Sequence, residues 1–190
     1  MDKYFGIAAG IITFLSFFPY FRDVINRVAK PERASWFIWI VIGPIAIFSQ
    51  LALGAGPSIW LVAMDTLGGI IGFILAVIYG SGWLKKRDYI GLAIAGLGLI
   101  LWQFTHHAAY ALITIILIDL VGTVLNTVKT YEDPGSETPT LWLCVAFAGL
   151  LAAISVGEFN PVLLIYPLYI FLANISVPIA MLLGRNKKKQ

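Results

Sequence analysis

Long apolar runs separated by short polar segments dominate the pattern of this chain. The runs cover residues 4–21, 34–53, 57–84, 89–104, 108–128, 140–156 and 161–184. A helix needs about 20 apolar residues to cross the roughly 30 Å of hydrocarbon in a bilayer. The runs are continuously apolar, whereas the strands of a membrane barrel alternate lipid-facing and lumen-facing residues. The pattern therefore predicts seven transmembrane helices and an all-α integral membrane protein.

Composition supports this class. Apolar residues make up 59% of the chain and charged residues only 12%, against about 45–50% and about 25% in soluble domains. A soluble globular fold is therefore excluded.

The charged residues indicate how the helices are oriented. Seven crossings place the first, third and fifth connections and the carboxyl terminus on one side of the membrane. Of the 13 Lys and Arg residues, only Lys3 lies on the other side. By the positive-inside rule, the carboxyl terminus is cytoplasmic and the amino terminus is outside. We therefore expect a multi-pass protein of the inner (plasma) membrane, whose net charge of +3 reflects topology and indicates no nucleic-acid partner.

The two halves of the chain resemble each other. A shift of 103 positions aligns Pro31 with Pro134 and Trp39 with Trp142. The predicted organisation is a triple-helix bundle (1–84), a linker helix (85–105) and a second triple-helix bundle with a basic tail (106–190). Because the linker crosses once, the two triplets have the same orientation, which makes a parallel repeat with its axis along the membrane normal. Such a repeat forms a central cleft for a substrate, or serves only to build a stable bundle.

The stretch SFFPYFRDV (residues 16–24), followed by a polar loop and a new helix, resembles the PQ-loop pattern of the SWEET and SemiSWEET sugar transporters. That family also has three helices, a linker and three helices. Pro19 matches the proline of the motif, and Tyr20 stands where the family has glutamine. The resemblance implies alternating-access transport of a small polar metabolite, sugar-like or vitamin-like, since nicotinamide riboside carriers share the architecture. A trafficking receptor has the same fold, so a receptor-like or structural protein without transport is the alternative.

Prolines near the helix ends are candidate hinges. The resemblance implies this role for Pro19 and Pro139, which fit two of the family's four hinge prolines. Pro44 is a candidate on physical grounds, because a proline inside a helix removes a hydrogen bond at a cost of about 3 kcal/mol. Lipid tolerates that defect only where neighbours or water satisfy the freed carbonyl. Pro19 also lies close to a helix end, where the missing hydrogen bond costs little. Its interpretation as a hinge and its interpretation as a tolerated helix-end proline therefore both stay open.

Two acidic residues lie inside the apolar runs. Asp65 and Asp119 each cost about 2.5–3.5 kcal/mol at the centre of a membrane helix, and Asp119 lies roughly 16 Å along its helix, near the midplane. No Lys or Arg lies at a comparable depth. The two carboxyl groups must face water, hydrogen-bond to neighbours or be protonated, which makes proton-linked transport a hypothesis. Neutral aspartic acids that only bridge helices are the alternative.

Five further residues complete the predicted substrate site. Asn174 resembles the sugar-contacting asparagine of the family, and Trp142 resembles its sugar-stacking tryptophan. Trp39, Gln50 and Tyr169 are added as aromatic or polar groups inside the runs. Tryptophan near the end of a span is more often an interfacial anchor, and this reading is preferred for Trp36, Trp60, Trp83, Trp102 and Trp142.

Motifs for other classes are missing from the sequence. There is no zinc-protease motif, phosphate-binding glycine loop or nucleophile elbow, and two adjacent histidines, His106 and His107, do not make a metal site. The last run contains no lysine for a retinal Schiff base. We expect no enzyme, no cofactor and no metal, with a small-molecule substrate and the lipid bilayer as partners. The sequence leaves homo-oligomerisation open.

Overall fold

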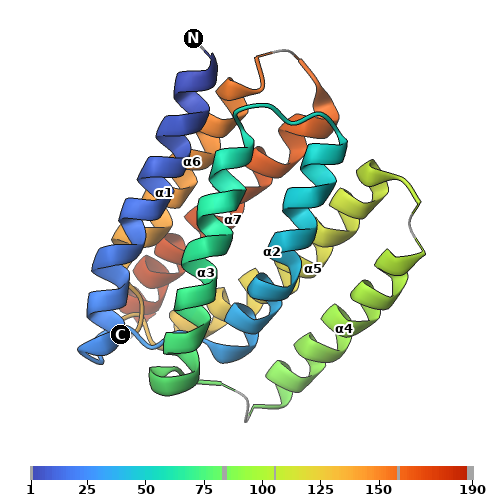
Figure 1. Cartoon of the computed structure of the whole chain (residues 1–190). Helices are drawn as coiled ribbons and strands as arrows, with labels where there is room; N and C mark the ends of the chain where they lie inside the picture. Colours follow the sequence, from blue (N-terminus) through green and yellow to red (C-terminus); the bar gives the residue numbers. More distant parts are fainter. Residues whose placement is uncertain (1, 83–84, 105, 158, 188–190) are drawn as a thin grey trace.

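The computed structural model describes residues 2–82, 85–104, 106–157 and 159–187. Within these residues the chain forms seven α-helices (Figure 1). Their bounds are α1 Asp2–Ile25, α2 Arg33–Ala52, α3 Ile59–Tyr79, α4 Lys86–Gln103, α5 Ala108–Glu132, α6 Pro139–Ser155 and α7 Pro161–Lys187. The all-helical prediction is confirmed, and each helix covers most of one predicted run.

Five of the helices in the described part of the chain, α1, α2, α3, α5 and α7, are long and apolar enough to cross a membrane. The other two fall short for different reasons. Helix α6 is apolar but has only 17 residues, and α4 begins with the charged residues Lys86, Arg87 and Asp88. This set of helices is typical of a helical membrane protein.

The outer surface of the bundle is apolar. Large side chains such as Phe48, Leu97 and Leu172 are more than half exposed. Water would solvate such a surface poorly, whereas lipid tails accept it at no cost, so an exposed apolar surface of this extent marks a membrane or protein contact.

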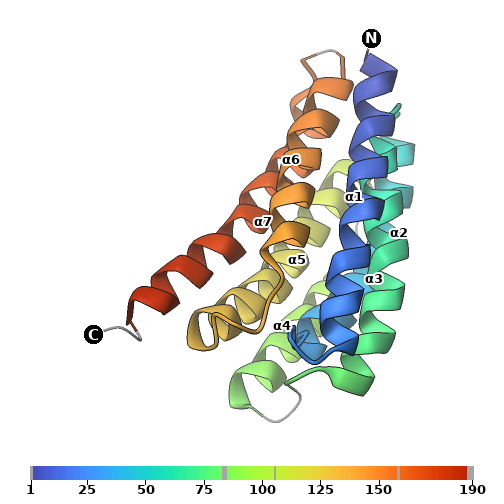
Figure 2. The same cartoon turned by 90° about the vertical axis from the view of Figure 1, so that its left-hand side faces the viewer.

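The helices form two layers of three (Figures 1 and 2). In the first layer α3 packs between α1 and α2, and in the second α7 packs between α5 and α6. The layers meet through α1 against α6 and α2 against α5, and α4 lies outside the two layers against α5. This arrangement brings residues from both halves of the chain to a common interior.

Glycines allow the helices of each layer to approach closely. A Cβ on Gly10 of α1 would lie 2.9 Å from the Cβ of Trp60 in α3. A Cβ on Gly149 of α6 would lie 2.8 Å from the carbonyl oxygen of Pro167 in α7. Small residues at such contacts are the usual basis of helix packing in membranes, because close approach maximises van der Waals contact.

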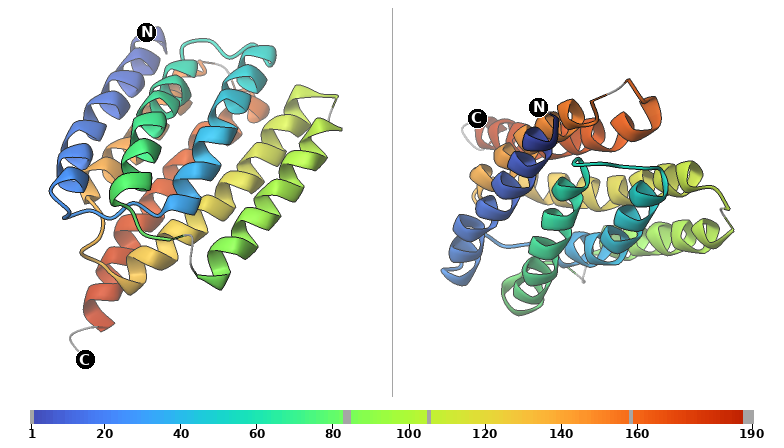
Figure 3. Two further views of the ribbon diagram at one scale, coloured as in Figure 1. Left: turned by 60° about the horizontal axis from the view of Figure 1, so that its bottom comes forward. Right: turned by 45° about the horizontal axis from the view of Figure 1, so that its top comes forward.

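The α1–α2, α3–α4 and α5–α6 connections lie together at one end of the bundle, here called the basic end (Figure 3). The backbone N–H of Lys30 donates to the carbonyl of Ser136 at 2.8 Å, and that of Arg33 donates to Ser81 at 2.7 Å. The hydroxyl of Thr138 donates to the Asp23 carboxylate at 2.9 Å. The bonds from Lys30 to Ser136 and from Thr138 to Asp23 tie the two layers together at the basic end, whereas the bond from Arg33 to Ser81 joins α2 to the segment after α3 within one layer.

Candidate functional site

A cavity lies between the two layers, and all the helices that line it belong to these layers. Six helices, α1, α2, α3, α5, α6 and α7, contribute side chains to its wall, and α4 contributes none. The volume of the cavity that the centres of water molecules can occupy is about 60 Å³. Since one water needs about 10–15 Å³ by this measure, the cavity has room for several waters or part of a small solute.

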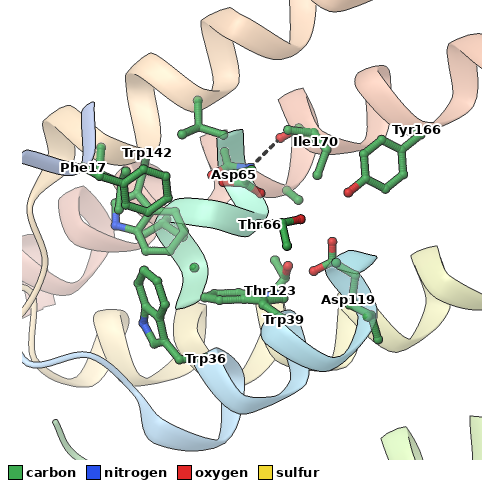
Figure 4. Close-up of a pocket in the computed structure, with 18 residues that line it drawn as sticks. Phe17, Trp36, Trp39, Asp65, Thr66, Asp119, Thr123, Trp142, Tyr166 and Ile170 are labelled. Carbon is green, nitrogen blue, oxygen red and sulfur yellow. Dashed lines mark hydrogen bonds between the residues drawn. The ribbon is translucent and has the colours of Figure 1, made fainter. Parts of the chain in front are cut away.

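One part of the wall is polar. Asp65 and Thr66 come from α3, Asp119 and Thr123 from α5, and Tyr166 from α7. In Figure 4 the carboxyl group of Asp119 and the hydroxyl groups of Thr66 and Tyr166 point toward the same space. The two carboxyl groups are close enough for their charges to interact.

The two aspartates differ in their partners. Asp119 lies in hydrogen-bonding reach of the Trp39 indole and the Tyr169 phenol, and the Tyr169 hydroxyl is 3.4 Å from that of Thr123. The Asp65 carboxylate has no hydrogen bond or ion pair with another described residue. None of the residues that line the cavity is Lys, Arg or His. The described wall therefore holds two acids and no base.

The part of the wall nearer the basic end is aromatic. The rings of Phe17 and Trp36 lie 6.4 Å apart between centroids, those of Trp36 and Trp39 5.5 Å, and those of Trp39 and Trp142 5.9 Å. Tyr20 stacks on the outer side of Trp36 at 5.3 Å. Four adjacent rings from α1, α2 and α6 thus form a continuous aromatic surface beside the acids (Figure 4).

Glycines on the helices make room for these rings. A Cβ on Gly68 would overlap the Phe17 ring, and one on Gly72 would overlap the Trp36 ring. A Cβ on Gly122 would lie 2.9 Å from Trp39 Nε1. Gly69 is different, because a Cβ there would meet no described atom within 4 Å. It borders the open space of the cavity.

Most of the predicted substrate residues meet at this cavity. Trp39, Asp65, Asp119, Trp142 and Asn174 all line it, and Tyr169 adjoins it through Thr123 and Asp119. The Asn174 side chain donates one amide hydrogen to the Ile170 carbonyl at 2.9 Å. That bond, drawn in Figure 4, holds the amide against its own helix.

Gln50 is not brought to the cavity. It lies in the last turn of α2, its side chain is buried, and its Nε2 finds no partner among the described residues.

The preferred interpretation of two tryptophans as interfacial anchors is wrong. Trp36 and Trp142 are only 2% and 6% exposed, and both line the cavity. Trp60 is half exposed, as an anchor would be. Trp83 lies outside the described residues.

The three candidate hinge prolines occupy different environments. Pro19 and Pro44 lie inside α1 and α2, where each removes a helical hydrogen bond. Pro139 is the first residue of α6, a position at which the N–H has no helical partner in any case. A hinge at Pro139 therefore cannot arise from a missing bond inside the helix.

The basic end contains a buried ion pair that the sequence did not suggest. The Lys129 ammonium group binds the Glu137 carboxylate, and their side chains are 8% and 0% exposed. Lys129 also donates to the Lys30 carbonyl at 2.8 Å, and Glu137 accepts from Trp142 Nε1 at 3.0 Å. No pattern in the sequence indicates this pair, because charged residues next to loops are normally solvated.

This arrangement is suited to binding. Among the described residues no group of three His, Cys, Asp or Glu side chains could hold a metal ion. The cavity instead offers carboxylate, hydroxyl and aromatic surfaces, which recognise a solute by charge, hydrogen bonding and stacking. Comparisons of the chain with family models, with curated proteins and with solved structures gave no match.

Proposed function

We propose that this protein is a membrane transporter that moves a small polar metabolite by alternating access through the cavity between two triple-helix bundles. The triplets are α1–α3 and α5–α7, joined by α4 as a linker. The protein lies in the inner (plasma) membrane with its amino terminus outside, so that the basic end is cytoplasmic, as the positive-inside rule requires.

The pairwise packing of the helices supports a parallel repeat. Exchanging α1, α2 and α3 for α5, α6 and α7 turns the contact of α1 with α6 into that of α5 with α2, and both exist. The contacts of α3 with α1 and α2 become those of α7 with α5 and α6, which also exist. A twofold relation between the triplets accounts for this pattern, and substrate sites of transporters favour such repeat interfaces.

The cavity is the observation that carries the proposal. Ionisable residues inside a membrane are expensive and usually mark a substrate or ion pathway. Asp65 and Asp119 come from different triplets and face one cavity. If their role were only to bridge two packed helices, no open space would be needed between them.

The loops at the basic end form the cytoplasmic gate. The bonds from Lys30 to Ser136 and from Thr138 to Asp23 join the two triplets. Opening the cavity toward the cytoplasm requires these bonds to break, and Pro19 in α1 lies near this end as a candidate hinge. Reversible protonation of Asp65 or Asp119 would link proton movement to transport.

A matched pair of glycine variants tests the proposal. Gly69 and Gly96 are both helical glycines at which a Cβ meets nothing within 4 Å, but only Gly69 lines the cavity. The purified protein is reconstituted into liposomes, and uptake of labelled glucose, riboflavin and choline is measured. We expect uptake of at least one probe, lost in Gly69→Leu and retained in Gly96→Leu.

Uptake that Gly69→Leu leaves unchanged would contradict the assigned pathway. If none of the probes is taken up although one of them binds, transport is contradicted and the receptor-like alternative is supported. If no probe binds or enters, the proposal fails altogether.

A further inference from the structure

We infer that the cavity binds a small organic ammonium ion. The binding is inferred from the cavity alone, and only the transport of this ion rests on the proposed function. Three features of the wall lead to this class: its charge, its aromatic surface and the placement of its hydroxyl groups.

The charge of the wall favours a cation. Two carboxyl groups, Asp65 and Asp119, face the cavity, and none of the described residues that line it is basic. A buried carboxylate without a counter-ion is strongly unfavourable. Asp65 in particular has no partner among the described residues. A bound cation would compensate this charge, an anion would be repelled, and a neutral solute would leave the charge uncompensated.

The aromatic surface favours an alkylated cation over a metal ion. Trp36, Trp39 and Trp142 form adjacent rings at centroid spacings of 5.5 and 5.9 Å, and Phe17 extends them. The faces of aromatic rings attract cations within about 6 Å, and such cages typically recognise quaternary ammonium groups. The carboxylates line the same cavity as these rings, so that one ammonium group can contact a carboxylate and the aromatic surface together.

Hydroxyl groups complete the site. Thr66, Thr123 and Tyr166 line the cavity near the acids. They can donate to or accept from a hydroxyl or carbonyl on the same ligand. The small volume of the cavity limits such a ligand to a few heavy atoms beyond the ammonium group.

The decisive comparison uses choline and 3,3-dimethylbutan-1-ol, which have the same shape but differ in charge. Binding to the detergent-purified protein is followed by tryptophan fluorescence, because three of the four rings in the aromatic part of the wall are indoles. We expect choline to bind at least about tenfold more tightly than the neutral alcohol, a difference of about 1.4 kcal/mol. Tetramethylammonium serves as a second cation.

Aspartate variants assign the effect to the cavity. Asp65→Asn and Asp119→Asn should each weaken choline binding by about tenfold or more, and Asp2→Asn, an exposed residue at the start of α1, should not. Monodisperse elution and a cooperative unfolding transition show that each variant is folded. Should one variant fail to fold, the other and the comparison of the two ligands still decide.

Equal affinity for the two ligands, or unchanged choline binding in the Asp65→Asn and Asp119→Asn double variant, would overturn the inference. Transport of glucose or riboflavin blocked by Gly69→Leu, with no choline binding, overturns the inference and leaves the proposed function standing. Choline binding without uptake of any probe supports the inference and contradicts the proposed transport function.

Discussion

Two groups of acids inside this protein are held in opposite ways. At the basic end Glu137 is buried against the ammonium group of Lys129 and also accepts the indole N–H of Trp142. In the cavity Asp65 and Asp119 are close enough to repel each other, and no described basic residue lines the wall. Glu137 has a cationic partner within the fold, and among the residues that line the cavity Asp65 and Asp119 have none.

The difference separates structural charges from functional ones. Burial of an ion pair is tolerated when geometry and hydrogen bonds satisfy both members, and Glu137 then helps to fix the loops of the basic end. Unpaired acids in a membrane contribute nothing comparable to stability, so their presence requires another explanation. A ligand or proton that comes and goes is the explanation that we propose.

The largest effect is expected from breaking the pair at the basic end. Lys129→Met leaves Glu137 buried without its cation and should lower the free energy of unfolding by about 3–5 kcal/mol. The double variant Lys129→Met and Glu137→Met should recover most of this loss, because an apolar pair can replace a buried ion pair. Unfolding is followed by titration with a denaturing detergent.

Lys85 is the matched control. It pairs with Glu132, but both side chains are about half exposed, so Lys85→Met should cost less than about 1 kcal/mol. If Lys129→Met were equally mild, the basic-end pair would not be a structural element and the comparison would fail.

Two glycines of α3 should respond oppositely to alanine. A methyl group on Gly72 overlaps the Trp36 ring, whereas one on Gly69 enters open space. Gly72→Ala should lower stability by about 1–3 kcal/mol through overpacking, and Gly69→Ala should raise it by up to about 1 kcal/mol through helix propensity. Thermal unfolding of the two variants checks the sign. A loss at both positions would mean that the cavity is filled.

Neutralising a cavity acid should have little effect on folding. Asp119→Asn keeps the shape of the side chain and removes an uncompensated charge, so its free energy of unfolding should stay within about 1 kcal/mol of the wild type or rise. The same variant should lose ligand binding. A loss of several kcal/mol would instead identify Asp119 as a structural residue like Glu137.

The smallest effect concerns Glu32 at the start of α2. Burial raises the pKa of its carboxyl group above the ordinary value of 4.5, and the charge of Asp88 adds to the shift, although bonds from Ser35 oppose it. A raised pKa means that the folded state binds the proton more tightly, so the stabilisation is present at low pH and is lost as pH rises past 4.5.

The wild type should therefore lose stability relative to Glu32→Gln as pH increases from 4 to 8. Melting temperatures of the two proteins across this range provide the measurement. A constant difference would show that Glu32 titrates normally.

The sequence predicted the helices well because length and hydropathy are local properties. It also identified Asp65 and Asp119, since an acid in an apolar run stands out whatever the fold. It could not place Gln50 or Trp36, because runs that are apolar on every face do not reveal which side of a helix faces inward. It missed Lys129 with Glu137, because their pairing depends on how the α5–α6 loop folds back.

The most direct test of the central claim, that the cavity is a substrate pathway open to each side in turn, is thiol labelling. In a Cys144→Ser background, Gly69→Cys is exposed to a membrane-impermeant methanethiosulfonate that carries a trimethylammonium group, in right-side-out and in inside-out vesicles. The account predicts modification from both sides, slowed by choline, and none at Gly96→Cys. If Gly69→Cys is not modified in one of the two kinds of vesicle, this claim is contradicted.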